Sequence, residues 1–342
     1  MCAMAGLFSD YARLLRLPGL GGLSIAPVFG ALSVGVFDLW KLTVLFLIGA
    51  FSSIFGFVLN DYVDVEVDRL SKDLASRPLV KGTISRRTAL LICGICVVGA
   101  FVAIFLVFYN SYPAFVYGIV AILLSAVFGS VYNFYGKRFV GSDFVVALSE
   151  ALLVLFGALM VVQGNPLSIF TWIIFVLTFN QLVYENAVSG GIKDADHDYL
   201  MKVKNIALSS GVKVTTENQL IITRKFQAFG IGFRLFSIVL IFVPVVFYQH
   251  TYSYTWWNIG LLVLFALGVL FASIKMLRLK IFERNTLRRL ITMQTFLRYS
   301  LVPLMLIPLI AVVPAVILIL LPFIWYIVCA PLIGEKLFRP GL

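Results

Sequence analysis

The sequence has few charged residues. Asp, Glu, Lys and Arg make up 13% of its 342 residues, whereas hydrophobic residues make up 61% and the mean hydropathy is +1.02. Soluble domains are about 25% charged and about 45–50% apolar. This shortage of charge excludes a water-soluble globular protein.

Cysteine and histidine are also scarce, with four and two residues. Four cysteines do not make a disulfide framework, and Cys93 and Cys96 lie in an apolar run without a second cysteine pair that could complete a zinc site. The N-terminal segment holds Asp10 and only two arginines, which is unlike a transit peptide. We therefore expect inert, buried cysteines and a first apolar run that stays in the membrane.

Long apolar runs dominate the chain. A membrane-spanning helix needs about 20 mostly apolar residues, and the continuous runs exclude the alternating strands of a transmembrane β-barrel. Four prolines interrupt the last run, so a tenth span is an alternative to nine. The sequence predicts an all-α polytopic membrane protein, a single domain over residues 1–342, with spanning helices at 20–37, 42–59, 89–108, 114–131, 144–162, 168–189, 228–247, 256–276 and 299–328.

Basic residues are concentrated on one side of this predicted membrane topology. With nine spans, the N-terminal segment and the loops after even-numbered helices hold 22 Lys and Arg residues, against three on the other side. Such an excess is typical of cytoplasmic loops, so it explains the net charge of +11 without a nucleic-acid partner. Nothing indicates an obligatory protein partner. The basic segment 278–298 has interleaved apolar residues, which predicts a helix on the cytoplasmic membrane surface.

Acidic residues cluster at the predicted cytoplasmic ends of the second and sixth helices, in loops at 60–88 and 185–227. Asp61, Asp64 and Asp68 follow Asn60 at a spacing that places all three within about 60° of one helical face. Three neighbouring carboxylates near hydrocarbon repel each other, so we expect a cation among them. Oxygen ligands without His or Cys favour Mg²⁺, which also takes ligands from substrate phosphates.

The second cluster is a weaker signal by itself. Asp194 and Asp198 lie about 40° apart on a helix, whereas Asp196 points to the far side. Basic residues surround both clusters. Carboxylate-bound metal ions beside basic side chains predict a cradle for a diphosphate.

These residues resemble the UbiA superfamily of intramembrane prenyltransferases. The resemblance covers residues 10–200 and is carried by four segments. They are Asn60-Asp61-x-x-Asp64-x-x-x-Asp68 with Arg77-Pro78-Leu79 and Gly82-Thr83-Ile84-Ser85, then Asp194-x-x-x-Asp198, Tyr132 to Lys137, and Arg13-Leu-Leu-Arg16-Leu-Pro18.

The resemblance implies a bundle of nine helices around a central cavity, in which two Mg²⁺ ions hold an isoprenyl diphosphate. It implies transfer of the prenyl chain to a lipophilic acceptor, such as an aromatic quinone precursor or a glycerol-ether lipid. It implies that Asp61, Asp64 and Asp68 bind one ion with support from Asn60, and that Asp194 and Asp198 bind the other. It further implies that Lys137, Arg77 and Tyr132 lie at the diphosphate and that Arg16 faces the acceptor.

Several alternatives stay open at this point. Asp196 could replace one of its neighbours as a metal ligand, and Tyr135 competes with Tyr132 for the tyrosine position. Glu150 and Glu185 lie within predicted spans, where acids are candidates for function. The alternative function is a secondary transporter that couples cations through the aspartates, although transporter sites normally lie near the membrane midplane.

Overall fold

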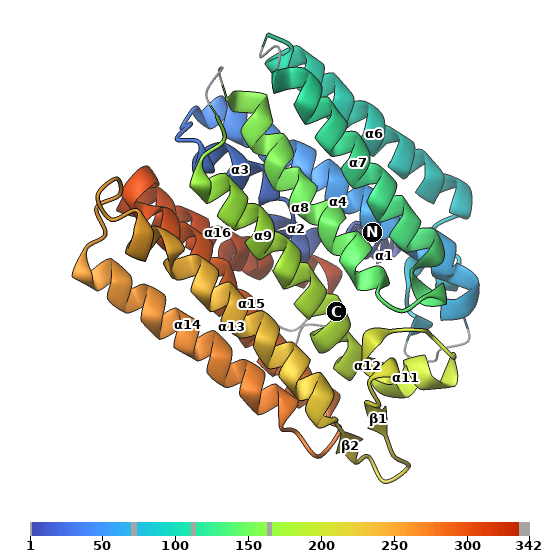
Figure 1. Cartoon of the computed structure of the whole chain (residues 1–342). Coiled ribbons are helices and arrows are strands. Elements are labelled where there is room, and N and C mark those ends of the chain that lie inside the picture. The colour runs from blue at the N-terminus through green and yellow to red at the C-terminus, as the bar shows by residue number, and fades with distance from the viewer. Residues whose placement is uncertain (1, 70–73, 111–113, 163–165, 335–342) are drawn as a thin grey trace.

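The computed structural model describes residues 2–69, 74–110, 114–162 and 166–334, and within these ranges the fold is a bundle of long helices (Figure 1). The only strands in the described part form a two-stranded antiparallel hairpin, β1 (Lys213–Val214) and β2 (Leu220–Ile221). The principal helices are α1 (Cys2–Leu14), α2 (Leu20–Leu23), α3 (Ala26–Ser33), α4 (Leu39–Asp68), α5 (Pro78–Lys81), α6 (Arg86–Phe108), α7 (Ala114–Tyr135), α8 (Ser142–Val161), α9 (Ile169–Val183), α13 (Arg224–Phe247), α14 (Trp256–Leu277), α15 (Arg284–Ile310) and α16 (Val312–Cys329).

The predicted helical membrane bundle is confirmed. Eight helices of the described chain are long and apolar enough to span a membrane, namely α4, α6, α7, α8, α13, α14, α15 and α16. The N-terminal pair 6–14 and 17–33, bent by 50°, makes a ninth candidate. Helix α9 has 15 residues, but its backbone continues as a π-helix over Tyr184–Gly190 and follows the bundle (Figure 1).

The last predicted run, 299–328, consists of two helices. Helix α15 ends at Ile310, Ala311 has a φ of 63°, and α16 then turns back along α15. The rings of Phe296 and Phe323 stack with centroids 3.6 Å apart, which joins the two arms of this hairpin. Arg13 on α1 donates to the Ile333 carbonyl at 2.7 Å, so the end of α16 lies beside the N-terminal helix. The last run is therefore divided into two helices, as the alternative reading of its prolines allowed, while the candidate spans of the described chain number eight, or nine with the bent pair.

The predicted surface helix at 278–298 is wrong. Arg284 begins α15, a continuous helix of 27 residues that the sequence prediction had divided. Leu287 and Leu290 are buried in a cluster with Phe226 of α13 and Met276 of α14. These two leucines therefore pack against neighbouring helices and not against a membrane surface.

Close backbone contact joins α3 to α8 in the middle of the bundle. A Cβ atom placed on Gly157 would lie 1.9 Å from the Pro27 carbonyl oxygen, and one on Gly30 would lie 2.0 Å from the Val154 carbonyl oxygen. Small residues allow membrane helices to approach this closely and to pack without a hydrophobic driving force. The glycines therefore fix the helix that leads from the N-terminal segment into the bundle.

We expect Gly157→Ala to destabilise the bundle by about 1–3 kcal/mol, because the added methyl group overlaps the backbone of α3. The measurement is the apparent melting temperature of the purified protein in detergent. Gly94→Ala on α6 is the matched control, since a Cβ there meets nothing within 4 Å. Equal melting temperatures for the two variants would contradict this account of the α3 contact.

Candidate active site

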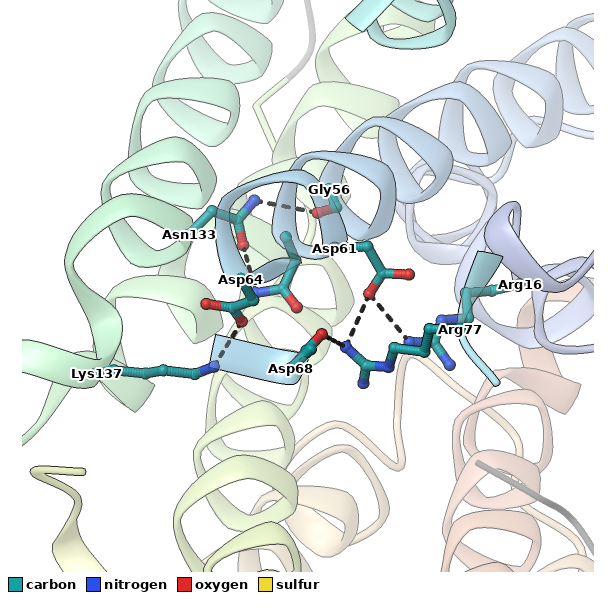
Figure 2. Close-up of polar contacts among 9 residues, drawn as sticks. Arg16, Gly56, Asp61, Asp64, Asp68, Arg77, Asn133 and Lys137 are labelled. Carbon is teal, nitrogen blue, oxygen red and sulfur yellow. Dashed lines mark hydrogen bonds and ion pairs between the residues drawn. The ribbon is translucent and has the colours of Figure 1, made fainter. Parts of the chain in front are cut away.

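The first acid cluster lies at the end of α4 and is neutralised by basic side chains from other segments (Figure 2). Asp61, Asp64 and Asp68 are all buried. The Arg77 guanidinium contacts Asp68 and lies 3.1 Å from the Asp61 carboxylate, and Arg16 approaches the same Asp61 oxygen at 3.5 Å. The helix thus presents two of its acids to a pair of arginines.

Asp64 faces a different partner from its two neighbours. The Lys137 Nζ atom, which comes from the segment after α7, lies 2.7 Å from the Asp64 carboxylate. Figure 2 shows Lys137 reaching Asp64 from the side opposite to Arg77. The phase difference of about 40–60° between these acids on one helix is enough to separate them into two ion-pair groups.

Asn60 connects α4 with α7 beside this group. Its Nδ2 atom donates to Asn133 Oδ1 at 3.4 Å. Asn133 in turn donates to the Gly56 carbonyl at 3.1 Å (Figure 2). These amide contacts fix the position of α7, from which Tyr132 and Lys137 extend. Sequence reasoning missed Asn133, although an asparagine one residue after the motif tyrosine was a visible signal.

The second acid cluster follows the π-helix that ends α9. Asp194 precedes the short helix α11 (Ala195–Leu200), and Asp198 lies one turn later and accepts a hydrogen bond from Asn205 at 2.7 Å. Asp196 projects elsewhere, because both of its oxygens contact Arg284 Nη2 at 2.9 and 2.8 Å. The helical phase predicted from the sequence agrees with this arrangement, but Asp196 is ion-paired with α15 instead of being free in solvent.

A polar cavity of about 190 Å³ brings the two acid clusters together. Asp64, Asp194 and Asp198 line it, and Lys137 is its basic residue within the described part of the chain. The further polar side chains in its wall are Asn60, Tyr132, Asn133, Ser142, Asp143, Asn186 and Asn205. The lining does not include Asp61 and Asp68 of α4 or their partners Arg77 and Arg16.

The electrostatics of the cavity favour a cation. Burial and, to a smaller extent, the negative charge of Asp194 together raise the pKa of Asp198 to about 6, against smaller opposing effects of His197 and Lys137. A cation between these carboxylates would offset both the loss of solvation and the repulsion between the two negative charges. No three His, Cys, Asp or Glu residues of the described chain lie close enough to hold a metal alone. The carboxylate and amide oxygens that line the cavity fit Mg²⁺, which completes its coordination with water and substrate phosphates.

A second, larger cavity of about 740 Å³ continues from the polar one into the bundle. Asn60, Tyr132, Asn133 and Asn186 line both cavities. Its remaining wall is largely apolar, with Phe29, Phe51, Phe55, Phe57, Phe101 and Phe296 among the lining side chains, and it also holds Glu150 and Glu185.

The two candidate tyrosines have different environments. Tyr132 is part of the boundary between the cavities. Tyr135 is 51% exposed, and its ring lies under the Arg138 guanidinium at 5.4 Å. Of these two tyrosines, only Tyr132 is therefore placed to contact a ligand in the cavities.

A family comparison connects this geometry with a known reaction. Residues 23–296 match the model of the UbiA prenyltransferase family. The chain belongs to this family. It is a membrane prenyltransferase that moves a prenyl chain to a lipophilic acceptor, and the family result gives no support to the transporter alternative.

Individual relatives agree with the family assignment. The digeranylgeranylglyceryl phosphate synthase of Sulfurisphaera tokodaii is 26% identical over 76% of this chain and 98% of its own length. The 4-hydroxybenzoate octaprenyltransferase of Blochmanniella pennsylvanica is 27% identical over 46% of this chain and 50% of its own. A UbiA homologue from Archaeoglobus fulgidus, solved with GPP and Mg²⁺, has the same fold, with a TM-score of 0.59, 19% identity and coverage of 84% and 96%.

The three acids of the second cluster should have unequal importance. We expect Asp194→Ala and Asp198→Ala each to lower kcat/KM about 10²-fold, because each removes a carboxylate from the polar cavity. Asp196→Ala should cost less than about fivefold, since its partly exposed pair with Arg284 contributes little. Initial rates of prenyl transfer at saturating Mg²⁺ measure the difference. A loss in Asp196→Ala as large as that in Asp198→Ala would assign the ligands differently.

Proposed function

We propose that the chain binds an isoprenyl diphosphate with its phosphates in the polar cavity and its prenyl chain in the larger cavity. The observation that carries this proposal is the continuity of the two spaces through Asn60, Tyr132, Asn133 and Asn186. An acidic chamber joined to an apolar one matches a ligand with a charged head, held through metal ions, and a long hydrocarbon tail.

Two Mg²⁺ ions are proposed to bind through Asp61, Asp64 and Asp68 on α4 and through Asp194 and Asp198 near α11. Bound there, the ions supply positive charge that stabilises the leaving diphosphate. Arg77 and Lys137 neutralise the α4 acids in the described structure. With the acids neutralised by metal, both bases become available to diphosphate oxygens, which pair well with guanidinium and ammonium groups.

The walls of the larger cavity protect the reacting carbon from water. Loss of diphosphate leaves positive charge on the allylic carbon, so a water molecule at that position would divert the reaction. Aromatic rings such as those of Phe55 and Phe57 exclude water and face a cation favourably. Tyr132 lies where the two cavities meet and is proposed to orient the diphosphate end of the prenyl chain.

A glycerol-ether lipid is the acceptor that we favour. The digeranylgeranylglyceryl phosphate synthase relative aligns over nearly its whole length, whereas the 4-hydroxybenzoate relative aligns over half of its own. The compounds in both names carry an acidic group, which is a phosphate in the first and the carboxylate of hydroxybenzoate in the second. Mass spectrometry of products from a panel that contains both acceptor types identifies the substrate.

Activity should depend on a divalent metal. We expect EDTA to abolish release of diphosphate from geranylgeranyl diphosphate and Mg²⁺ to restore it, because the acids of the polar cavity hold no substrate without a cation. Asp64→Asn should lower the rate at least about 10²-fold, equivalent to about 2.7 kcal/mol of barrier. Full diphosphate release and product formation in EDTA would refute the metal-assisted reaction.

The active-site end of the bundle is proposed to face the cytoplasm. Basic residues are concentrated in the segments at that end, such as those around Lys81, Lys137 and Lys204. The hairpin of α15 and α16 adds the segment around Ile333 to the same end, through its contact with Arg13.

Cysteine labelling tests this orientation. In a variant without the four native cysteines, Thr83→Cys, Lys204→Cys and Leu332→Cys should react with an impermeant maleimide only from the cytoplasmic face. Asn110→Cys and Gln249→Cys should react only from the outside and serve as the opposite-face controls. Labelling of Thr83→Cys and Lys204→Cys from different faces would separate the two acid clusters and rule out a shared diphosphate site.

A further inference from the structure

The larger cavity has one polar wall, made by α9 and α15. Gln181, Glu185, Thr295, Arg298 and Tyr299 form this wall, and all of them line the cavity. Ion pairing and hydrogen bonding join the two helices, because Glu185 accepts from Thr295 at 2.9 Å and from Arg298 at 3.3 Å. None of these residues has a role in the proposed binding of metal or diphosphate.

Two guanidiniums, of Arg298 and Arg234, line the cavity at the polar wall. Arg234 of α13 is only 2% exposed, and its guanidinium lies 3.4 Å from the ring centroid of Tyr184. Its described hydrogen-bond partners are all uncharged: Gln181 at 3.2 Å, Gln294 at 2.9 Å and Ser273 at 3.0 Å. Glu185 pairs with Arg298, so Arg234 has no carboxylate among its described hydrogen-bond partners.

Unused hydrogen-bond donors point to the same ligand chemistry. Gln181 is 5% exposed, and its Nε2 atom has no partner among the described residues. The Arg298 Nε atom and the Tyr299 hydroxyl are likewise buried without a partner in this part of the structure. A buried donor without an acceptor is costly. Three such donors beside the Arg234 guanidinium, which has no described carboxylate partner, point to an anionic ligand.

We propose that the polar wall binds the acidic head group of the acceptor, a phosphate or a carboxylate. This inference rests on the proposed function and names the chemistry of its second substrate. Asn186, next to Glu185 in the π-helix, lines both cavities. An acceptor held by its anionic group at the wall therefore places its nucleophilic end in the chamber that receives the prenyl chain.

Gln181→Glu is the sharpest test, because the new carboxylate can still accept from Arg234 but replaces the unpaired donor with negative charge. Two acceptor pairs supply the probes: a geranylgeranylglyceryl phosphate and its uncharged alcohol, and 4-hydroxybenzoate and its amide. We expect the variant to raise KM for the preferred acidic acceptor about tenfold or more. KM for geranylgeranyl diphosphate and for the uncharged acceptors should remain within about twofold.

Tyr299→Phe is a second variant that keeps the ring and removes only the hydroxyl donor. We expect it to raise KM for the acidic acceptor about threefold or more. Tyr117→Phe is its matched control, since Tyr117 is 64% exposed on the outer face of α7. Equal effects of Gln181→Glu on acidic and uncharged acceptors would overturn the proposal, as would equal use of both by the wild-type enzyme.

Binding without turnover separates this inference from the proposed reaction. Calorimetric titration of the wild-type protein in EDTA should show tighter binding of the acidic acceptor than of its uncharged counterpart, and Gln181→Glu should abolish that difference. Preferential binding in EDTA without any transfer after Mg²⁺ is added would support the polar wall and refute the reaction. Transfer with no preference for the acidic group would refute the polar wall alone.

Discussion

Charged groups inside an apolar bundle require compensation, and this constraint governs the active-site end of the molecule. An isolated carboxylate or guanidinium near hydrocarbon is costly, so such groups pair with each other or with a ligand. Arg77 and Lys137 compensate the acids of α4, and Arg298 compensates Glu185. These pairs also join segments distant in sequence, so neutralisation and assembly of the site depend on the same contacts.

The irregular end of α9 allows the second acid cluster to meet the first. The backbone widens into a π-helix over Tyr184–Gly190, passes through the short helix Gly191–Lys193 and restarts at α11. Single-turn π segments are frequent at functional sites. A Cβ on Gly191 would lie 2.6 Å from the Ala207 Cβ, so this turn also requires a small residue.

Hydrophobic runs and acid spacing were sufficient to predict most helices and the two acid clusters, because membrane helices and helical faces have fixed periods. The same rules could not separate Asp64 from Asp61 and Asp68, since partners from three other segments decide where each carboxylate points. The hairpin at Ala311 depends on backbone conformation rather than composition. The pair of Glu185 and Arg298 was also beyond prediction, because 113 residues separate its members.

Helix α15 connects the two halves of the proposed reaction. Its first residue, Arg284, contacts Asp196, which lies in the sequence between the two acids that face the polar cavity. Further along the same helix, Arg298 and Tyr299 line the larger cavity. Helix α15 thus contacts the second acid cluster at its start and the larger cavity about halfway along its length, while Asn60 of α4 and Tyr132 of α7 lie where the two cavities meet.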